Sequence, residues 1–170
     1  MRKASVHAVV KALNDAGVRY LVVGGLAVNA YGIPRFTADM DVVIRLTPEN
    51  IRKAFAALAK LGFRPMVPVT AESFADTPTR EGWIRDKGMR VLRFHSNQHW
   101  ETPVDFFVEE PFPFEKEYAK AEEREFADGV AIRVVTLKTL SRMKQEAGRP
   151  KDLADLSDLA SRKKSRGKKS

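Results

Sequence analysis

A glycine pair and two aspartates one residue apart are the residues of this chain best suited to chemistry. Gly24 and Gly25 end the apolar run 20–23, and Asp39 and Asp41 follow after a thirteen-residue gap. Glycine has no Cβ, so the backbone N–H groups of such a turn can approach phosphate oxygens. Residues i and i+2 of a strand face the same side, so two carboxylates at that spacing can hold a divalent cation. The pattern predicts metal-assisted phosphate chemistry.

The residues before the aspartates extend this surface. Arg35, Thr37, Asp39 and Asp41 share one parity, so all four face the same way if the strand reaches back to Arg35. Two carboxylates on that scaffold suit Mg²⁺, which keeps several waters and takes other ligands from substrate phosphates. Two such ions would activate a nucleophile and neutralise the leaving group in an in-line phosphoryl displacement.

The glycine and aspartate motif has a recognisable order. The string Val23-Gly24-Gly25, the gap and Asp39-Met40-Asp41-Val42 resembles the signature of the DNA polymerase β-like nucleotidyltransferase superfamily. Residues 24–42 are similar to small bacterial members, including nucleotidyltransferase-type toxins of abortive-infection and toxin–antitoxin systems, and residues 143–156 resemble the group's closing helical motif. The resemblance implies an α+β nucleotidyltransferase fold, with a mixed β-sheet, packed helices and a C-terminal helical segment.

The resemblance also implies roles for individual residues. Nucleotide binding falls to a set that combines glycines, a hydroxyl and cations: Gly24, Gly25, Arg35, Thr37, Lys144 and Lys151. Asp39 and Asp41 are the implied ligands of Mg²⁺, for which Mn²⁺ is the implied substitute. A third carboxylate is implied on a neighbouring strand, where it completes the metal site or helps to deprotonate the attacking hydroxyl. Asp105, flanked by Val104 and Phe106, fits this role, with Glu101 and Asp86 as competitors.

Alternating elements are expected to position these residues. Helices are predicted over 3–16, 26–31, 48–61, 115–125, 137–147 and 151–160, and strands over 20–23, 39–46, 63–69, 89–95, 104–108 and 130–135. Residues 70–82 are expected to form a polar loop, and residues 83–86 a further short strand. The early β–α–β units favour a mixed sheet over an all-α or all-β fold. Asp152, Asp155 and Asp158 are interpreted as structural, because acids early in a helix favour its dipole.

The 170 residues predict a single domain over 1–160, in which 136–160 form closing helices. The last ten residues, 161–170, hold six basic side chains and no acid, whereas the preceding 160 hold 24 basic and 22 acidic side chains. We expect a disordered tail, which is interpreted first as a solubilising end and alternatively as an anchor on RNA, DNA or another anionic surface.

Composition excludes several kinds of site. The chain has no cysteine, which excludes disulfides and thiolate–zinc sites. No apolar run approaches the ~20 residues of a membrane span, so a cytoplasmic protein without a membrane partner is expected. His95 and His99 lie four apart, but no helix is predicted there, and zinc is disfavoured. No P-loop or GxGxxG motif occurs.

The leading hypothesis is an Mg²⁺-dependent nucleotidyltransferase that moves a nucleoside monophosphate from an NTP to a hydroxyl of an RNA, a protein or a small molecule. The alternative is a non-catalytic regulatory or antitoxin-like protein on the same fold. A purely nucleic-acid-binding domain is less favoured, because the body is nearly neutral and lacks a recognisable reading helix. A cognate toxin or antitoxin is a further expected partner.

Overall fold

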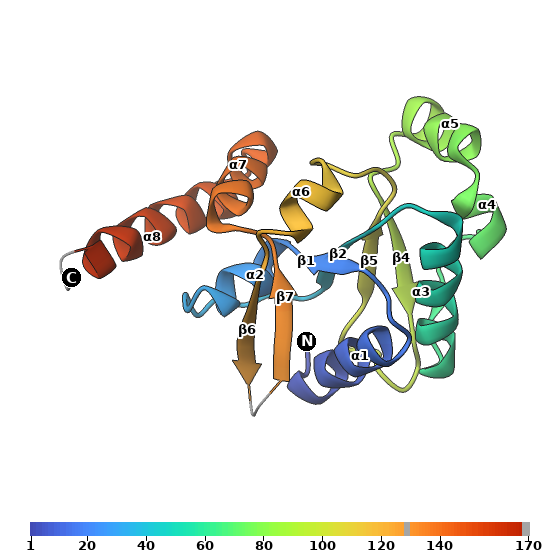
Figure 1. Cartoon of the computed structure of the whole chain (residues 1–170), viewed down its shortest axis with the longest axis horizontal. Helices are drawn as coiled ribbons and strands as arrows, with labels where there is room; N and C mark the ends of the chain where they lie inside the picture. The colour runs from blue at the N-terminus through green and yellow to red at the C-terminus, as the bar shows by residue number, and fades with distance from the viewer. Residues whose placement is uncertain (128–129, 168–170) are drawn as a thin grey trace.

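Short strands alternate with helices along the chain, and the strands assemble into a mixed sheet against which the helices pack (Figure 1). The computed structural model describes residues 1–127 and 130–167, with side chains over 1–125 and 131–161. The strands are β1 (Tyr20–Val22), β2 (Met40–Ile44), β3 (Arg64–Pro65), β4 (Val91–His95), β5 (Val104–Phe107), β6 (Glu122–Ala127) and β7 (Val130–Val134). The helices are α1 (Lys3–Asp15), α2 (Gly24–Ala30), α3 (Pro48–Lys60), α4 (Ala71–Ala75), α5 (Thr77–Lys87), α6 (Phe114–Tyr118), α7 (Leu137–Ala147) and α8 (Pro150–Gly167). The predicted α+β class is confirmed.

The sheet has the strand order β3-β4-β5-β2-β1-β7-β6. β2 pairs with β5 and β1 with β7 in parallel, while the β1–β2, β3–β4, β4–β5 and β6–β7 pairs are antiparallel. This order brings β2, which follows the glycine pair, beside β5, which lies some sixty residues later in the chain. The predicted mixed sheet is therefore confirmed, and its centre joins the two segments that carry the aspartates.

One side of β2, β4 and β5 is apolar and buried. Phe94 and Phe106 are almost completely inaccessible, and the ring of Phe55 in α3 lies 5.0 Å from that of Phe94 and 6.4 Å from that of Phe106. α3 thus covers this side of the sheet. Because side chains alternate along a strand, the neighbouring residues of β2, β4 and β5 face the opposite side.

α1 packs beside α3 with an apolar stripe at helical spacing, as the sequence predicts. The residues of this stripe are fully buried, and each such aliphatic side chain stabilises the fold by about 1.5–3 kcal/mol relative to an exposed one. They are Val6, Val9, Val10 and Leu13.

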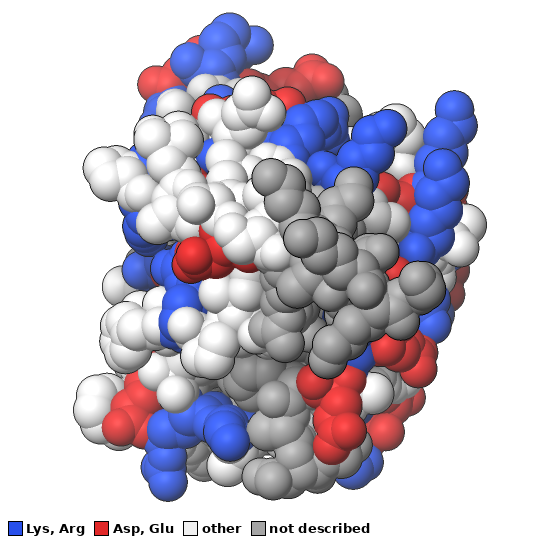
Figure 2. Space-filling view, turned by 90° about the vertical axis from the view of Figure 1, so that its left-hand side faces the viewer, with Lys and Arg blue, Asp and Glu red and all other residues white. Residues whose placement is uncertain are grey.

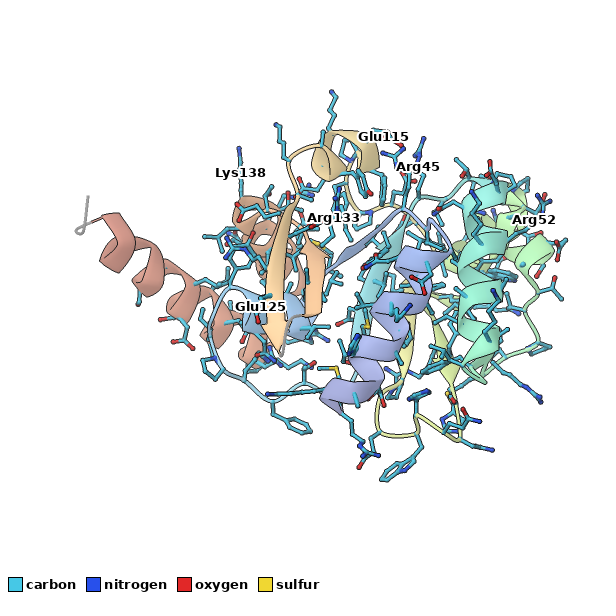
Figure 3. All side chains as sticks on the ribbon, turned by 60° about the horizontal axis from the view of Figure 1, so that its bottom comes forward. Arg45, Arg52, Glu115, Glu125, Arg133 and Lys138 are labelled. Atoms are coloured by element: carbon cyan, nitrogen blue, oxygen red, sulfur yellow. The ribbon has the colours of Figure 1, made fainter. Side chains whose placement is uncertain are left out.

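Side chains of α6 contact both the end of β2 and the start of α7. Glu115 of α6 forms an ion pair of 3.1 Å with Arg45, and the two side chains lie together near α6 in Figure 3. Glu117 accepts hydrogen bonds from the backbone N–H of Thr136, at 2.6 Å, and from the hydroxyl of Thr139, at 2.7 Å. An acid at a helix N-terminus satisfies free N–H groups and favours the helix dipole. These contacts fix the direction of α7, whose later turns carry Lys144.

The predicted loop at 70–82 is wrong, because the structure contains α4 and α5 there, and α5 also includes the predicted strand 83–86. Thr70 and Ser73 form a reciprocal capping box at α4, and Asp76 caps α5 by accepting from the Thr79 N–H at 3.0 Å. Both helices are short, and α5 buries little, so their apolar periodicity is weak. Capping, rather than periodicity, was the available signal.

Three further predictions differ from the structure. The helix predicted at 115–125 is a short α6 followed by strand β6, and the strand predicted at 63–69 shrinks to the two residues of β3. α8 continues to Gly167, so residues 161–167 of the tail predicted to be disordered are helical, while 168–170 lie outside the described residues. Among the helices of the described residues, none is both long and apolar enough to cross a bilayer.

Candidate active site

A row of charged residues crosses three adjacent strands on the side of the sheet opposite α3. Arg93 of β4 pairs with Asp105 of β5 in the antiparallel register, and Asp105 pairs with Asp41 of β2 in the parallel register. Each of the three alternates with buried apolar residues of its own strand. The register alone therefore places one guanidinium and two carboxylates side by side.

A cavity of about 530 Å³ opens over this row. Its wall is formed by the start of α2, the segment before β2, the row itself and the residues around the α7–α8 junction. All nine residues predicted for the site line it: Gly24, Gly25, Arg35, Thr37, Asp39, Asp41, Asp105, Lys144 and Lys151. Glu101 and Asp86, the competitors for the third carboxylate, are not among the lining residues, so Asp105 is the candidate that the structure brings to the site.

The glycine pair allows the aspartate segment to come very close to α2. Gly24 has φ +65°, and a Cβ there would lie 2.0 Å from Asp41 Oδ2. A Cβ on Gly25 would lie 2.6 Å from Thr37 Oγ1. Any larger residue would therefore push Asp41 or Thr37 out of place. The glycines bring the backbone against the acidic strand as well as leaving it open to a ligand.

Asp41 is the carboxylate with the strongest electrostatic signature. Burial, together with the charges of Asp39 and Asp105, raises the pKa of its carboxyl to about 6, although Lys144 and Arg149 lower it. Among the described hydrogen bonds and ion pairs, none involves this carboxylate. A partly buried acid among like charges is typical of a site that receives a cation.

Arg93 is a site residue that the sequence reasoning missed. Its Nε and Nη2 donate to the two oxygens of Asp105 at 2.8 and 2.6 Å, and Nη2 also donates to Asp39 Oδ2 at 2.9 Å. These hydrogen bonds to Asp105 raise the pKa of Arg93. A signal existed, since Arg93 is a charged residue between apolar ones in a predicted strand, as Asp105 is. Its pairing depends on strand register, which the sequence does not show.

A divalent ion fits the Asp41 end of the charged row but not the Asp105 end, which Arg93 occupies. Across the described residues, no group of three or more His, Asp or Glu side chains has a geometry that could hold a metal. Arg93 bridges Asp39 and Asp105, so these two do not form one open oxygen cage with Asp41. Asp41 and the second oxygen of Asp39 accept no described hydrogen bond, and as hard oxygen donors they suit Mg²⁺.

Lys144 is held by carboxylates of α8. Its buried Nζ lies 2.9 Å from Asp152 Oδ1 and 2.8 Å from Asp155 Oδ2. Arg149 donates to Asp152 at 2.6 Å, and Arg35 pairs with Asp155. Burial alone would raise the pKa of Asp152, but the hydrogen bonds from Arg149 and Lys144 outweigh it and lower that pKa to about 2. The network fixes two predicted nucleotide ligands, Arg35 and Lys144, against α8.

Of the three α8 acids that the sequence analysis interprets as structural, two form buried ion pairs. Asp152 and Asp155 are buried in the network, whereas Asp158 is exposed and lies outside it. Lys151, which also lines the cavity, is exposed. The helix dipole therefore has a smaller role than the ion pairs to Lys144, Arg149 and Arg35.

The fold is similar to those of solved nucleotidyltransferases. The solution structure of the antibiotic-resistance factor ANT(2'')-Ia is 12% identical, with a TM-score of 0.60 over 93% of this chain and 82% of that one. Its crystal structure with adenylyl-2''-tobramycin is 13% identical, with a TM-score of 0.58 over 92% and 86%. TM1012, a candidate nucleotidyltransferase from Thermotoga maritima, is 13% identical, with a TM-score of 0.55 over 95% and 96%. At these identities the likeness shows a shared fold.

Sequence comparison identifies the family directly. No curated protein gives a significant match to the chain. The family model described as "Nucleotidyl transferase AbiEii toxin, Type IV TA system" matches residues 11–168, nearly the whole chain. The resemblance inferred from the glycine and aspartate motif is thereby confirmed, and the chain belongs to the AbiEii family of nucleotidyltransferase toxins of type IV toxin–antitoxin systems.

Proposed function

We propose that this protein transfers a nucleoside monophosphate from an NTP to a hydroxyl acceptor in an Mg²⁺-dependent reaction. The observation that carries the proposal is Asp41, a partly buried carboxylate without a described hydrogen bond, set against Gly24 and opposite Lys144 and Arg149 in one cavity. Carboxylates beside cations suit a ligand that combines a metal with phosphates. Asp39 and Asp41 would hold the ion, which supplies charge neutralisation for the phosphates when bound.

The chain's own residues divide the remaining work. Lys144, Arg149 and Lys151 offer positive charge to the triphosphate on the helical side of the cavity. The acceptor oxygen attacks the α-phosphorus, the bond from that phosphorus to the bridging oxygen breaks, and pyrophosphate leaves. The acceptor proton passes to the oxygen of Asp41 that does not hold the ion, since neither oxygen of Asp41 accepts a described hydrogen bond. Both oxygens of Asp105 already accept from Arg93, so Asp105 is a positioning residue in this proposal.

The acceptor is the open part of the proposal. A structural neighbour, ANT(2'')-Ia, was solved with adenylyl-2''-tobramycin, and the family name places its members in toxin–antitoxin systems. We propose a cytoplasmic acceptor from the classes RNA, protein and small molecule, and a cognate antitoxin as protein partner. On the end of the molecule shown in Figure 2, described Lys and Arg side chains are interspersed with Asp and Glu. The described side chains on that face form no extended basic track, and the six basic residues of 161–170 are the candidate RNA contact on the ground of their charge.

The test is transfer of label from each α-labelled NTP, with Mg²⁺, to RNA, to protein from a cell extract and to an aminoglycoside. We expect one acceptor class to be labelled, and Asp41→Asn to reduce the rate at least ~100-fold. The matched control is Asp158→Asn, which changes an exposed aspartate of α8 outside the cavity and should keep full activity. Undiminished transfer by Asp41→Asn would contradict the proposed site. Absence of transfer together with absence of metal-dependent nucleotide binding would favour the non-catalytic alternative.

A further inference from the structure

We propose that Arg93 is a fixed cation of the active site, which takes the place of a second metal ion beside Asp39 and Asp105. In this arrangement the protein carboxylates hold one divalent ion, at Asp41 and the second oxygen of Asp39, and Asp105 binds arginine instead of metal. The inference rests on the proposed function and concerns how the positive charge of the site is divided.

The contacts of Arg93 are those of a built ion pair. Its fork of N–H groups meets both oxygens of Asp105, at 2.8 and 2.6 Å, and the same Nη2 reaches Asp39 at 2.9 Å. Bidentate pairs of this kind are among the strongest charge-assisted hydrogen bonds. The Asp105 side chain is only 4% exposed, so its charge needs a partner in the folded state. Because the two residues are direct cross-strand neighbours, the sheet itself keeps them together.

The same contacts exclude a divalent ion from the Asp105 end of the row. An ion that bridged Asp105 and Asp39 would occupy the space of the guanidinium and would be repelled by its charge. Arginine stays protonated at every physiological pH, so deprotonation offers no way to remove that charge. Asp41 lies beyond Asp105 on the next strand and has no described hydrogen-bond donor. The row therefore has a position filled by arginine and a position suited to one metal ion.

Arg93 also has donors left for a substrate. No described hydrogen bond involves its Nη1, its side chain is 44% exposed, and the residue lines the cavity. A guanidinium with one edge on carboxylates and a free nitrogen facing solvent can donate to a phosphate oxygen of the nucleotide. Asp105 then acts through Arg93, by holding the guanidinium at the phosphates.

The number of metal ions tests this division directly. The full chain is titrated with Mn²⁺ in the presence of a non-hydrolysable NTP analogue, and bound Mn²⁺ is counted by electron paramagnetic resonance and calorimetry. We expect one Mn²⁺ per chain, whereas two would overturn the proposal. Asp105→Asn should change Mn²⁺ affinity by less than about threefold while weakening binding of the analogue about tenfold or more. A tenfold loss of Mn²⁺ affinity in Asp105→Asn would make Asp105 a metal ligand and would overturn the proposal too.

Variants of Arg93 test whether its charge limits Mn²⁺ binding. Arg93→Gln should bind Mn²⁺ at least about tenfold more tightly or take up a second ion, because the carboxylates lose their resident cation. Arg93→Gln leaves Asp105 buried without a partner, so Arg93→Gln/Asp105→Asn, which removes both charges, is measured beside it and should still bind one Mn²⁺ at Asp41. Arg85→Gln, which breaks an exposed Arg85–Asp86 pair on α5, is the control and should bind as the wild type does.

The metal site itself has a separate readout. Asp41→Asn should lose the single Mn²⁺, and retention of that ion would contradict the proposed function rather than the role of Arg93. Failure of the wild type to bind any Mn²⁺ would likewise contradict the proposed function. If Asp41→Asn loses Mn²⁺ but Arg93→Gln binds it with unchanged affinity, the metal site at Asp41 is supported and the proposed role of Arg93 is overturned.

Discussion

The contact between Gly24 and Asp41 is where a single Cβ decides the geometry of the site. Gly24→Ala would place a methyl group 2.0 Å from Asp41 Oδ2 at a residue with φ +65°. Gly88→Ala is a matched control, because Gly88 has φ +60° and no atom within 4 Å of its Cβ position. Both variants bear the left-handed backbone penalty of about 1–2 kcal/mol, but only Gly24→Ala must displace Asp41. We expect Gly24→Ala alone to lose Mn²⁺ binding and transfer activity, measured beside the free energy of unfolding. Equal activity in the two variants would show that the close contact is unimportant.

Asp41 should make the metal-free protein less stable as the pH rises. The pKa of its carboxyl is about 6 in the folded state and 3.8 for a free aspartate side chain, so the folded state binds the proton more tightly than the unfolded state does. The stabilisation from that proton is fully present below pH 3.8 and is lost as the pH rises to about 6. We expect Asp41→Asn to be more stable than the wild type at pH 7.5, by an amount of the order of 3 kcal/mol.

The measurement is thermal unfolding of both proteins without divalent ions from pH 4 to pH 8. The stability advantage of Asp41→Asn should grow between about pH 4 and pH 6 and then stay constant. Asp158→Asn provides the comparison for an exposed aspartate. An advantage that does not depend on pH would mean that ionisation of Asp41 is not its source.

At the scale of elements, the junction of α7 and α8 depends on a buried carboxylate with two cationic partners. Asp155 pairs with Lys144 of α7 and with Arg35 from the segment before β2. Asp155→Ala would leave both cations short of a partner, and we expect a loss of about 2–4 kcal/mol in the free energy of unfolding. Asp158→Ala, on the same helix but exposed, should change it by less than about 0.5 kcal/mol. Denaturant unfolding of the two variants measures this difference. Similar losses of unfolding free energy in both would show that the network does not hold α8.

The sequence predicted the site residues that belong to a local motif, and it missed contacts that depend on partners far along the chain. The glycine pair and the alternating aspartates lie within eighteen residues, and the segment 20–44 around them is sufficient to predict β1, α2 and β2. Arg93 reaches Asp39 and Asp105 only through the register of β4 on β5, and no pattern within one strand encodes a register. Lys144 was found, but its burial between Asp152 and Asp155 depends on the angle at which α8 leaves the α7 turn.

At the scale of the whole molecule, α8 carries positive charge away from the cavity. The helix begins at residues that line the cavity and projects from the body of the molecule (Figure 1). At 1.5 Å per residue, the end of α8 at Gly167 lies about 22 Å along the helix from Asp152. Six of the thirty basic residues fall after position 161, beyond a body that is close to neutral. An acceptor that contacts both places would have to be larger than a nucleotide.

Truncation after Ser161 tests whether that charge binds RNA. The truncated chain keeps the residues that line the cavity and loses six basic side chains, so we expect weaker RNA binding and a smaller dependence of affinity on salt. Each lost phosphate contact should reduce the slope of log K against log salt by about 0.7 for a single strand. Binding of an NTP analogue with Mn²⁺ should remain within about twofold of the full chain, because its contacts lie at the other end of α8. Fluorescence anisotropy with labelled RNA at several salt concentrations measures the slope. If the slope is the same in both proteins, the tail takes no part in RNA binding, and a protein or small-molecule acceptor becomes the favoured class.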